Sequence, residues 1–180
     1  MSHRLLCVLI LAAALPNAQS ATIPAEQQKT VTSYGTVLQV VDGDTFVLRE
    51  TGFLAAQKTI RFSAIDAPEL SQTHGLAARA ALHGLLSDAT VRIDCYKQDA
   101  RGREVCRVSI DGKDVALSML RQGAAWHFKR FEIEQASNER NAYINAERSG
   151  RKAKRGLWAA RNPMPPWDCR AALQALQNCR

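Results

Sequence analysis

Four acidic side chains in two short stretches are the residues best suited to chemistry. Asp42 and Asp44 lie in the stretch VVDGDT, and Asp66 and Glu69 lie in the stretch RFSAIDAPE. Carboxylates that are brought together repel one another unless a cation lies among them, and oxygen ligands suit a hard divalent ion such as Ca²⁺ or Mg²⁺. The spacing does not match the calcium loop of a helix-loop-helix protein. The acids therefore predict an open cation site with room for water and a phosphate.

Each acidic stretch also has a purely structural interpretation, which the sequence leaves open. Asp-Gly-Asp is a common hairpin turn. Asp-Ala-Pro-Glu can be a loop whose glutamate begins a helix, where the helix dipole favours an acid. The proline between the two acids stiffens this loop, so their spacing is held.

Arginines accompany the acids. Arg61 lies in an apolar strand that leads to Asp66, where an arginine needs a partner to offset its desolvation. Arg101 and Arg103 lie at a second turn, and guanidinium groups match phosphate oxygens in pairs. The alternatives are ion pairs to the acids themselves or a basic hairpin tip. A metal ion, a carboxylate and two arginines together indicate phosphodiester hydrolysis.

Length and charge set the broad class of protein. The chain has 180 residues and a formal net charge of +7 at pH 7. This length predicts one domain with a sizeable core. The charge favours a polyanionic partner, such as nucleic acid, an anionic membrane or an acidic protein, although a soluble surface alone can carry such an excess.

The N-terminus is typical of a secretory signal. Arg4 precedes an apolar run that ends at Leu15, Pro16 follows it, and small residues lead to an expected cleavage after Ser20. The run is too short for a stable membrane anchor. We therefore expect an exported monomer, periplasmic or secreted, with no membrane anchor after cleavage.

Four cysteines remain after the signal is removed. An even number in an exported chain predicts two disulfides, and four cysteines allow three pairings. Because each pair is local in sequence, Cys95–Cys106 and Cys169–Cys179 are favoured. A zinc site is the alternative, but there is no close Cys-x-x-Cys pair. A Cys95–Cys106 bond would brace the loop that carries Arg103.

Hydrophobic periodicity predicts an α+β fold with a small antiparallel sheet or barrel. Leu76, Ala80 and Leu82–Leu86 are expected to share the apolar stripe of the first helix, and Asp114 and Gly123 are expected to cap the second. Ser137 or Asn138 is expected to cap a third helix, which Gly150 should weaken locally. Strands are expected at 34–50 (a hairpin), 57–65, 90–96 and 104–110, and helices within 70–88, 115–122 and 138–155.

The stretches VVDGDT, IRFSAIDAPE, DARGREVCRV, LRQGAAW and AERSGRKAKRGLW occur in this order. From about residue 35 to 158 the sequence resembles the thermonuclease family, the staphylococcal-nuclease-like domains. The resemblance implies a five-stranded OB-fold β-barrel with three packed α-helices. The expected divisions are a signal peptide at 1–20, a flexible mature N-terminus at 21–32, a thermonuclease-like OB-fold domain at 33–160 and a Pro-rich, Cys-containing tail at 161–180.

The same resemblance implies a Ca²⁺-dependent nuclease that hydrolyses DNA and RNA and leaves 3′-phosphate ends. Asp44 and Asp66 would bind Ca²⁺ through their carboxylates, and Ala67 would bind it through its backbone carbonyl. Asp42 would support this site from nearby.

The remaining site residues follow from the same resemblance. Glu69 would be the general base that positions the attacking water, and Arg61 and Arg103 would hold the scissile phosphate. Arg101 stands where many members have an aromatic residue, and Lys129 and Phe131 replace tyrosines expected near the nucleotide. Arg101 and Lys129 are therefore candidates for binding nucleic acid by charge rather than by stacking.

Two alternatives to this function remain at the level of sequence. The first is a non-catalytic nucleic-acid-binding OB-fold module, which relatives become when the acids or arginines are lost. The second is a cation-binding secreted protein, which only the Asp-Gly-Asp turn favours.

Overall fold

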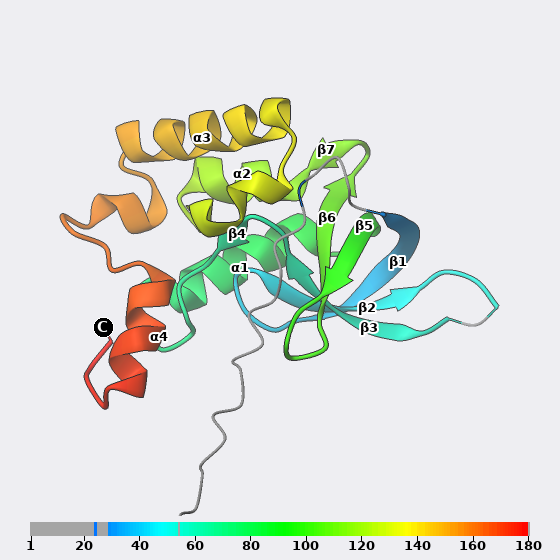
Figure 1. The fold of residues 1–180 in the computed structure, drawn as a ribbon, viewed down its shortest axis with the longest axis horizontal. Helices are drawn as coiled ribbons and strands as arrows, with labels where there is room; N and C mark the ends of the chain where they lie inside the picture. Colours follow the sequence, from blue (N-terminus) through cyan, green and yellow to red (C-terminus); the bar gives the residue numbers. More distant parts are fainter. Residues whose placement is uncertain (1–23, 25–28, 54, 180) are drawn as a thin grey trace, which may run out of the picture.

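The computed structural model describes residue 24 and residues 29–53 and 55–179 (Figure 1). The expected signal peptide and most of the expected flexible N-terminus lie outside these residues. The first strand, β1, begins at Val31, so Val31 and Thr32 belong to the sheet and not to the N-terminal segment that the sequence predicted. Their pairing with Cys95 and Asp94 on β5 accounts for this difference.

Five strands close into a barrel, which confirms the predicted α+β, OB-type fold. Antiparallel pairing joins neighbours in the order β3-β2-β1-β5-β6, and parallel pairing of β3 with β6 closes the barrel. Three two-residue strands add short pairings beside it. The strands are β1 (Val31–Val40), β2 (Thr45–Glu50), β3 (Gln57–Phe62), β4 (Ile65–Asp66), β5 (Thr90–Gln98), β6 (Glu104–Ile110), β7 (Lys113–Asp114) and β8 (Trp126–His127).

The predicted hairpin around the Asp-Gly-Asp turn is confirmed. β1 and β2 pair with Val40 opposite Phe46, and the turn between them carries Asp42 and Asp44. A side chain at Gly43 would overlap Ala67, so glycine lets this turn lie directly on the loop that follows β4. The two acidic stretches of the sequence therefore meet in space.

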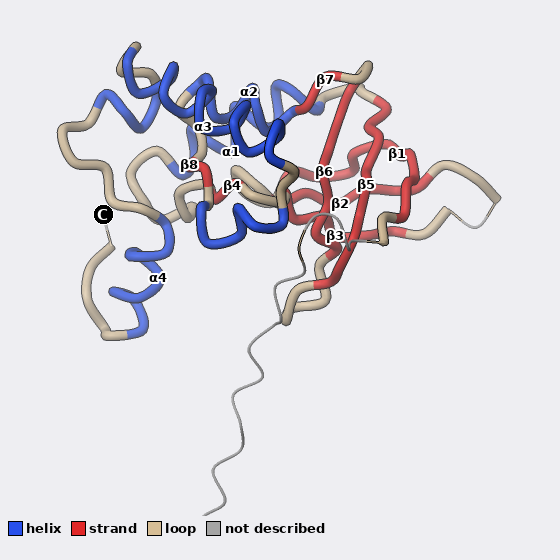
Figure 2. The backbone as a smooth tube through the Cα atoms, turned by 45° about the horizontal axis from the view of Figure 1, so that its top comes forward, coloured by secondary structure: helices blue, strands red, loops and turns tan. Residues whose placement is uncertain are grey.

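The helices lie to one side of the barrel (Figure 2). Helices α2 and α3 stack against each other, and α4 lies near the C-terminus (Figure 1). As predicted, Asp114 caps α2 by accepting hydrogen bonds from Ala116 and Leu117, and Gly123 ends it in the left-handed conformation. The helical segments are α1 (Gly75–Leu86), α2 (Val115–Gln122), η2 (Lys129–Glu134), α3 (Ser137–Lys152), η3 (Gly156–Ala159) and α4 (Pro166–Gln174).

The predicted apolar stripe of α1 was wrong at its start. Leu76 is 68% exposed and Ala80 is exposed as well. A side chain at Gly75 would overlap the carbonyl of Glu69, so the helix begins where its backbone passes against the loop that carries Glu69. That contact turns Leu76 to solvent, and the buried residues of α1 are Gly75, Ala78, Leu82 and Leu86.

The predicted side-chain cap of α3 was also wrong. The capping position is Ala136, which makes no side-chain cap hydrogen bond, while Asn138 accepts a hydrogen bond from the neighbouring Glu139 N–H. Gly150, expected only to weaken this helix, lies where a side chain would overlap the Leu120 carbonyl. Close packing of α3 on α2 therefore requires glycine there.

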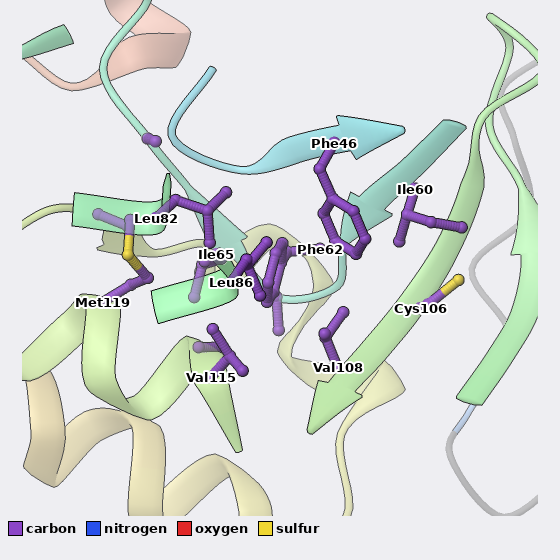
Figure 3. Close-up of a cluster of buried hydrophobic side chains, with 14 of the residues drawn as sticks. Phe46, Ile60, Phe62, Ile65, Leu82, Leu86, Cys106, Val108, Val115 and Met119 are labelled. Carbon is purple, nitrogen blue, oxygen red and sulfur yellow. The ribbon is translucent and has the colours of Figure 1, made fainter. Parts of the chain in front are cut away.

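The core lies between the barrel and helices α1 and α2 (Figure 3). Phe46 and Phe62 lie with ring centres 5.7 Å apart in this cluster. Full burial of such a side chain contributes about 1.5–3 kcal/mol. These contacts fix the end of β3, from which the chain passes to the acids. Further members labelled in the figure are Ile60, Ile65, Leu82, Leu86, Cys106, Val108, Val115 and Met119.

Two disulfides are present, in the local pairing that the sequence favoured. Cys95 and Cys106 face each other across β5 and β6, and Cys169 is bonded to Cys179 in the tail.

Trp126 and Trp158 are buried together in a second apolar cluster, against which Trp167 packs. None of the described helices combines the length and apolar composition needed to cross a membrane.

Candidate active site at the barrel rim

A cavity of about 360 Å³ opens at the rim of the barrel, where the acidic stretches meet the β5–β6 turn. Lys129 does not line it and lies instead on a neighbouring cavity together with Trp126 and Trp167. All the other residues predicted to bind the cation or the phosphate line the rim cavity: Asp42, Asp44, Arg61, Asp66, Ala67, Glu69, Arg101 and Arg103.

The two predicted cation ligands are tied to each other's loops. Asp44 accepts hydrogen bonds from the Ala67 N–H at 2.7 Å and from the Thr45 hydroxyl at 3.0 Å. Asp66 lies in β4 with its side chain only 1% exposed. Asp42 accepts a hydrogen bond from the Asp44 N–H at 3.0 Å, so it supports the turn that carries Asp44.

Arg61 projects from β3 between these two acids. Its Nε lies 3.2 Å from Asp44 Oδ1, and its Nη2 lies 3.0 Å from Asp66 Oδ1. Its Nη1 donates to the backbone carbonyls of Phe62 and Ile65 at 2.7 and 2.8 Å. Every guanidinium nitrogen is therefore in use, and the structure realises the ion-pair alternative for Arg61.

Burial disfavours the charged form of two acids in this cavity, Asp66 and Asp42. Burial raises the pKa of Asp66, hydrogen bonding from Arg170 and the charge of Arg61 oppose this, and the charge of Asp44 adds to it. Burial, followed by the charge of Asp44, raises the pKa of Asp42 to about 6. A cation among these carboxylates would relieve both effects.

Arg103 is aimed at the acids from the β5–β6 turn. Asp99 accepts hydrogen bonds from the Arg101 and Arg103 N–H groups at 2.9 and 3.0 Å and from Arg103 Nε at 2.7 Å. Although burial opposes it, this set lowers the pKa of Asp99. Arg103 Nη1 donates to the Thr45 hydroxyl at 3.1 Å, and its Nη2 has no partner among the described residues. Arg103 is therefore held in place with donor capacity left for an anion.

Glu69 is more solvent-accessible than the predicted cation ligands Asp44 and Asp66. Its side chain is 34% exposed, against 1% for Asp66. Its backbone N–H donates to Gln72 Oε1 at 2.8 Å, and Gly75 passes close to its carbonyl, so its loop is fixed. A carboxylate on a fixed loop with access to water suits a general base.

Sequence reasoning missed Arg170, a fourth arginine that lines the cavity. Its Nη2 lies 2.7 Å from Asp66 Oδ2, and its Nη1 lies 3.2 Å from Asp66 Oδ1 and 2.7 Å from Glu69 Oε1. It comes from α4, in the segment that was assigned to the tail. Its place directly after Cys169, in a disulfide-closed segment, is the signal that could have drawn attention to it.

Part of the cavity lining is aromatic. Phe131, which replaces an expected tyrosine, lies 5.1 Å from Phe128 between ring centres, and Lys97 Nζ lies 4.6 Å from the Phe131 ring centre. Tyr96 and Lys97 both contact the Glu134 carboxylate, at 2.9 and 2.5 Å. The cavity thus combines a charged wall with rings on which a base can stack.

The available oxygen donors suit a hard divalent ion with an incomplete protein shell. Among the described residues, no three His, Cys, Asp or Glu side chains are arranged to hold a metal by themselves. Asp44 and Asp66 offer two carboxylates, and Ala67 lies beside them. Water and substrate oxygens would have to complete the coordination, as is common for Mg²⁺ and open Ca²⁺ sites.

A closed OB-type barrel with an acid-and-arginine cavity at its rim defines a nuclease-like barrel domain. The model of the family described as "Staphylococcal nuclease homologue" matches residues 59–160. The chain belongs to this family.

Curated relatives agree with this assignment. The chain is 39% identical over 117 residues to "Probable staphylococcal-like nuclease CAN2" of Oryza sativa subsp. japonica, which covers 65% of this chain and 30% of the relative. It is 31% identical over 135 residues to an "Uncharacterized endonuclease" of Escherichia coli O157:H7, which covers 74% of this chain and 82% of that protein. The chain thus spans under a third of the first relative but most of the second.

Proposed function

We propose that the chain is an endonuclease that hydrolyses phosphodiester bonds of DNA and RNA and leaves 3′-phosphate ends. The observation that carries the proposal is that separate segments bring the following side chains to one cavity at the rim of an OB-type barrel: Asp44, Asp66, Glu69, Arg61 and Arg103. Membership of the staphylococcal nuclease homologue family and the names of the relatives support it.

Asp44, Asp66 and the backbone carbonyl of Ala67 would hold the cation, which we propose to be Ca²⁺. When bound, the ion polarises a phosphoryl oxygen and offsets the crowding of the acids. Asp42 holds the backbone of Asp44 and so maintains the turn.

Glu69 acts as the general base. Its carboxylate accepts a proton from water, and the oxygen of that water forms a bond to phosphorus. The bond between phosphorus and the 5′-oxygen breaks, and the 5′-oxygen takes a proton from solvent. Glu69 suits this role because it combines access to water with a fixed backbone.

The two barrel arginines have different parts in this reaction. Arg103 would bind a phosphate oxygen through its unpaired Nη2 and stabilise the charge that develops at phosphorus. Arg61 holds Asp44 and Asp66 at their separation, and its contact with phosphate would follow an exchange of partners.

Substrate binding beyond the phosphate would combine charge and stacking. Arg101 lines the cavity from the β5–β6 turn, and Phe128 and Phe131 line it as well. Lys129 lies on the adjacent cavity, where it could contact a neighbouring phosphate. The net charge of +7 favours the binding of a polyanion such as nucleic acid.

We also propose that the protein is exported, to the periplasm or the medium, and acts as a monomer. The apolar N-terminal run and the two disulfides support export, because disulfides persist in oxidising compartments.

The test is cleavage of single-stranded DNA and of RNA by the purified protein, with Ca²⁺ or with a chelator. Wild type should cut with Ca²⁺ and stop with chelator. Glu69→Gln removes the base and should lower the rate about 10³-fold or more. Asp168→Asn makes the same change of acid to amide on the exposed side of α4 and should keep the wild-type rate.

Two results would contradict the proposal. Binding of nucleic acid without cleavage by wild type would favour the non-catalytic module. A Glu69→Gln variant that cuts as fast as wild type would remove Glu69 from the mechanism.

A further inference from the structure

Helix α4 is anchored to the barrel side of the molecule by contacts other than its arginine. Trp167 stacks on Phe128, with ring centres 5.3 Å apart and planes inclined by 17°, and meets the edge of Trp126 at 5.6 Å. Just before the helix, the Met164 carbonyl accepts a hydrogen bond from Gln72 Nε2 at 3.2 Å. The position of α4 therefore does not depend on the ion pairs of Arg170.

The helix geometry directs Arg170 into the cavity. Residues three apart in a helix share one face, so Arg170 lies beside Trp167. Cys169, between them in sequence, is fully buried, and its bond to Cys179 closes the end of the chain over the helix. Arg170 thus reaches the acids from a segment that is both packed and cross-linked.

The contacts of Asp66 distinguish its two arginines. Oδ1 accepts from Arg61 Nη2 and also from Arg170 Nη1, whereas Oδ2 contacts Arg170 Nη2 at 2.7 Å. Arg170 Nη1 also lies 2.7 Å from Glu69 Oε1. One side chain therefore covers the Asp66 oxygen that Arg61 leaves open and, at the same time, the proposed general base.

Arg170 can leave these contacts more readily than Arg61. Its side chain is 35% exposed, whereas that of Arg61 is 13% exposed and is also bonded to two backbone carbonyls. At Glu69, which is 34% exposed, water can replace Arg170 at a small net cost, and at the buried Asp66 the entering cation would take its place.

We propose that Arg170 is a built-in competitor of the divalent cation. It occupies Asp66 and Glu69 in the cation-free protein and turns out to solvent when a cation binds, so that α4 sets the cation concentration needed to fill the site. This inference rests on the proposed cation site at Asp44 and Asp66.

The competition follows from geometry and charge. A divalent ion binds carboxylate oxygens at about 2.3–2.6 Å, which is too close to leave a guanidinium nitrogen on the same lone pair. An apparent dissociation constant rises by the inverse of the fraction of molecules whose site is open. If Arg170 covers the site in about nine molecules of ten, its removal tightens cation binding about tenfold.

The test is calorimetric titration of Ca²⁺ into the full chain without nucleic acid. Arg170→Gln should tighten Ca²⁺ binding about tenfold. Arg170→Lys keeps the charge but loses the two-nitrogen contact, so it should tighten binding by a smaller factor, about threefold. Arg161→Gln removes the same charge from an exposed position of the same tail and should change the affinity less than twofold.

The outcomes separate this inference from the proposed function. If wild type and the Arg170 variants bind Ca²⁺ equally well, or the variants bind it more weakly, competition by Arg170 is wrong while the cation site stands. If no variant binds Ca²⁺, both the cation site and the competition are wrong. Thermal unfolding in chelator checks that each variant is folded. If Arg170→Gln is unfolded, the Ca²⁺ affinity of Arg170→Lys tests whether Arg170 competes with the cation.

Discussion

Arg61 and Arg170 both contact Asp66, but different parts of the molecule place them. Arg61 belongs to strand β3, inside the barrel and inside the segment that the family model matches. Arg170 belongs to helix α4, beyond residue 160, where that match ends. One is enclosed by backbone carbonyls and acids, and the other is anchored through its helix and exposed at its tip.

This difference separates two needs of a site that is built from buried acids. Asp44 and Asp66 cannot be buried as anions without a partner, and Arg61, also held by two backbone carbonyls, meets that need in the cation-free protein. A cation can enter only if some other contact on the same carboxylates is reversible, and Arg170 supplies the contact that can be given up. Strand β3 thus supplies the positive charge that the acids need for folding, and α4 supplies the positive charge that a cation can replace.

The largest expected effect concerns Arg61, the enclosed arginine of this comparison. Arg61→Met should lower the free energy of unfolding by about 3–4 kcal/mol, because it leaves two buried carboxylates without their shared partner. Urea unfolding in chelator measures this change, and cleavage should fall with it. The matched Arg170→Met should lower the free energy of unfolding less, by about 1–2 kcal/mol, because Asp66 keeps Arg61 as a partner. Equal losses in the two variants would erase the distinction.

A smaller effect tests how α4 holds Arg170, the arginine whose contacts with the acids are proposed to be reversible. Replacing both tail cysteines, in the variant Cys169→Ser/Cys179→Ser, frees the end of α4 and should tighten Ca²⁺ binding about three- to fivefold, as measured by the same titration. Adding Arg170→Gln to this variant should tighten Ca²⁺ binding no more than Arg170→Gln alone does, because both changes act on the same contact. Fully additive effects would show that the disulfide acts on the site independently of Arg170.

The last prediction, with an effect of similar size, concerns Asp42, which neither arginine contacts among the described interactions. Its folded-state pKa of about 6 lies above the usual 3.8, so its protonation stabilises the fold at low pH. That stability is lost as the pH rises from about 4 through 6. In chelator, Asp42→Asn should therefore flatten the decline and be more stable than wild type at pH 7 by on the order of 1 kcal/mol, allowing for its partial exposure. Urea unfolding at pH 4 and at pH 7 checks this, and an unchanged pH slope would contradict it.

Much of the fold could be predicted from local features of the sequence. The Asp-Gly-Asp hairpin, the strands on either side of Arg103 and the caps of α2 depend on neighbours in the chain, so they could be predicted. The stripe of α1 could not, because several registers of an Ala- and Leu-rich helix are equally apolar. The contact of Gly75 with the Glu69 loop selects one of them.

The candidate site divides in the same way. The acids and Arg103 lie in recognisable turns, and the structure brings them together. Arg170 meets Asp66 from 104 positions along the chain, and no local pattern encodes that pairing. Lys129 was expected near the substrate from its place in the family order, but the η2 segment carries it to the neighbouring cavity.

The parallel seam between β3 and β6 bears on the order in which the molecule folds. Arg61 lies in this seam opposite Val105, and the next residue of β6, Cys106, is already bonded to Cys95 on the adjacent strand. Parallel pairing between distant segments forms late, whereas a disulfide-linked hairpin forms locally. A chain that has not closed its barrel therefore has the acids and Arg61 on one hairpin but lacks Arg103 beside them, since Arg103 comes from the β5–β6 turn. Competence for catalysis should appear in refolding only with this last closure.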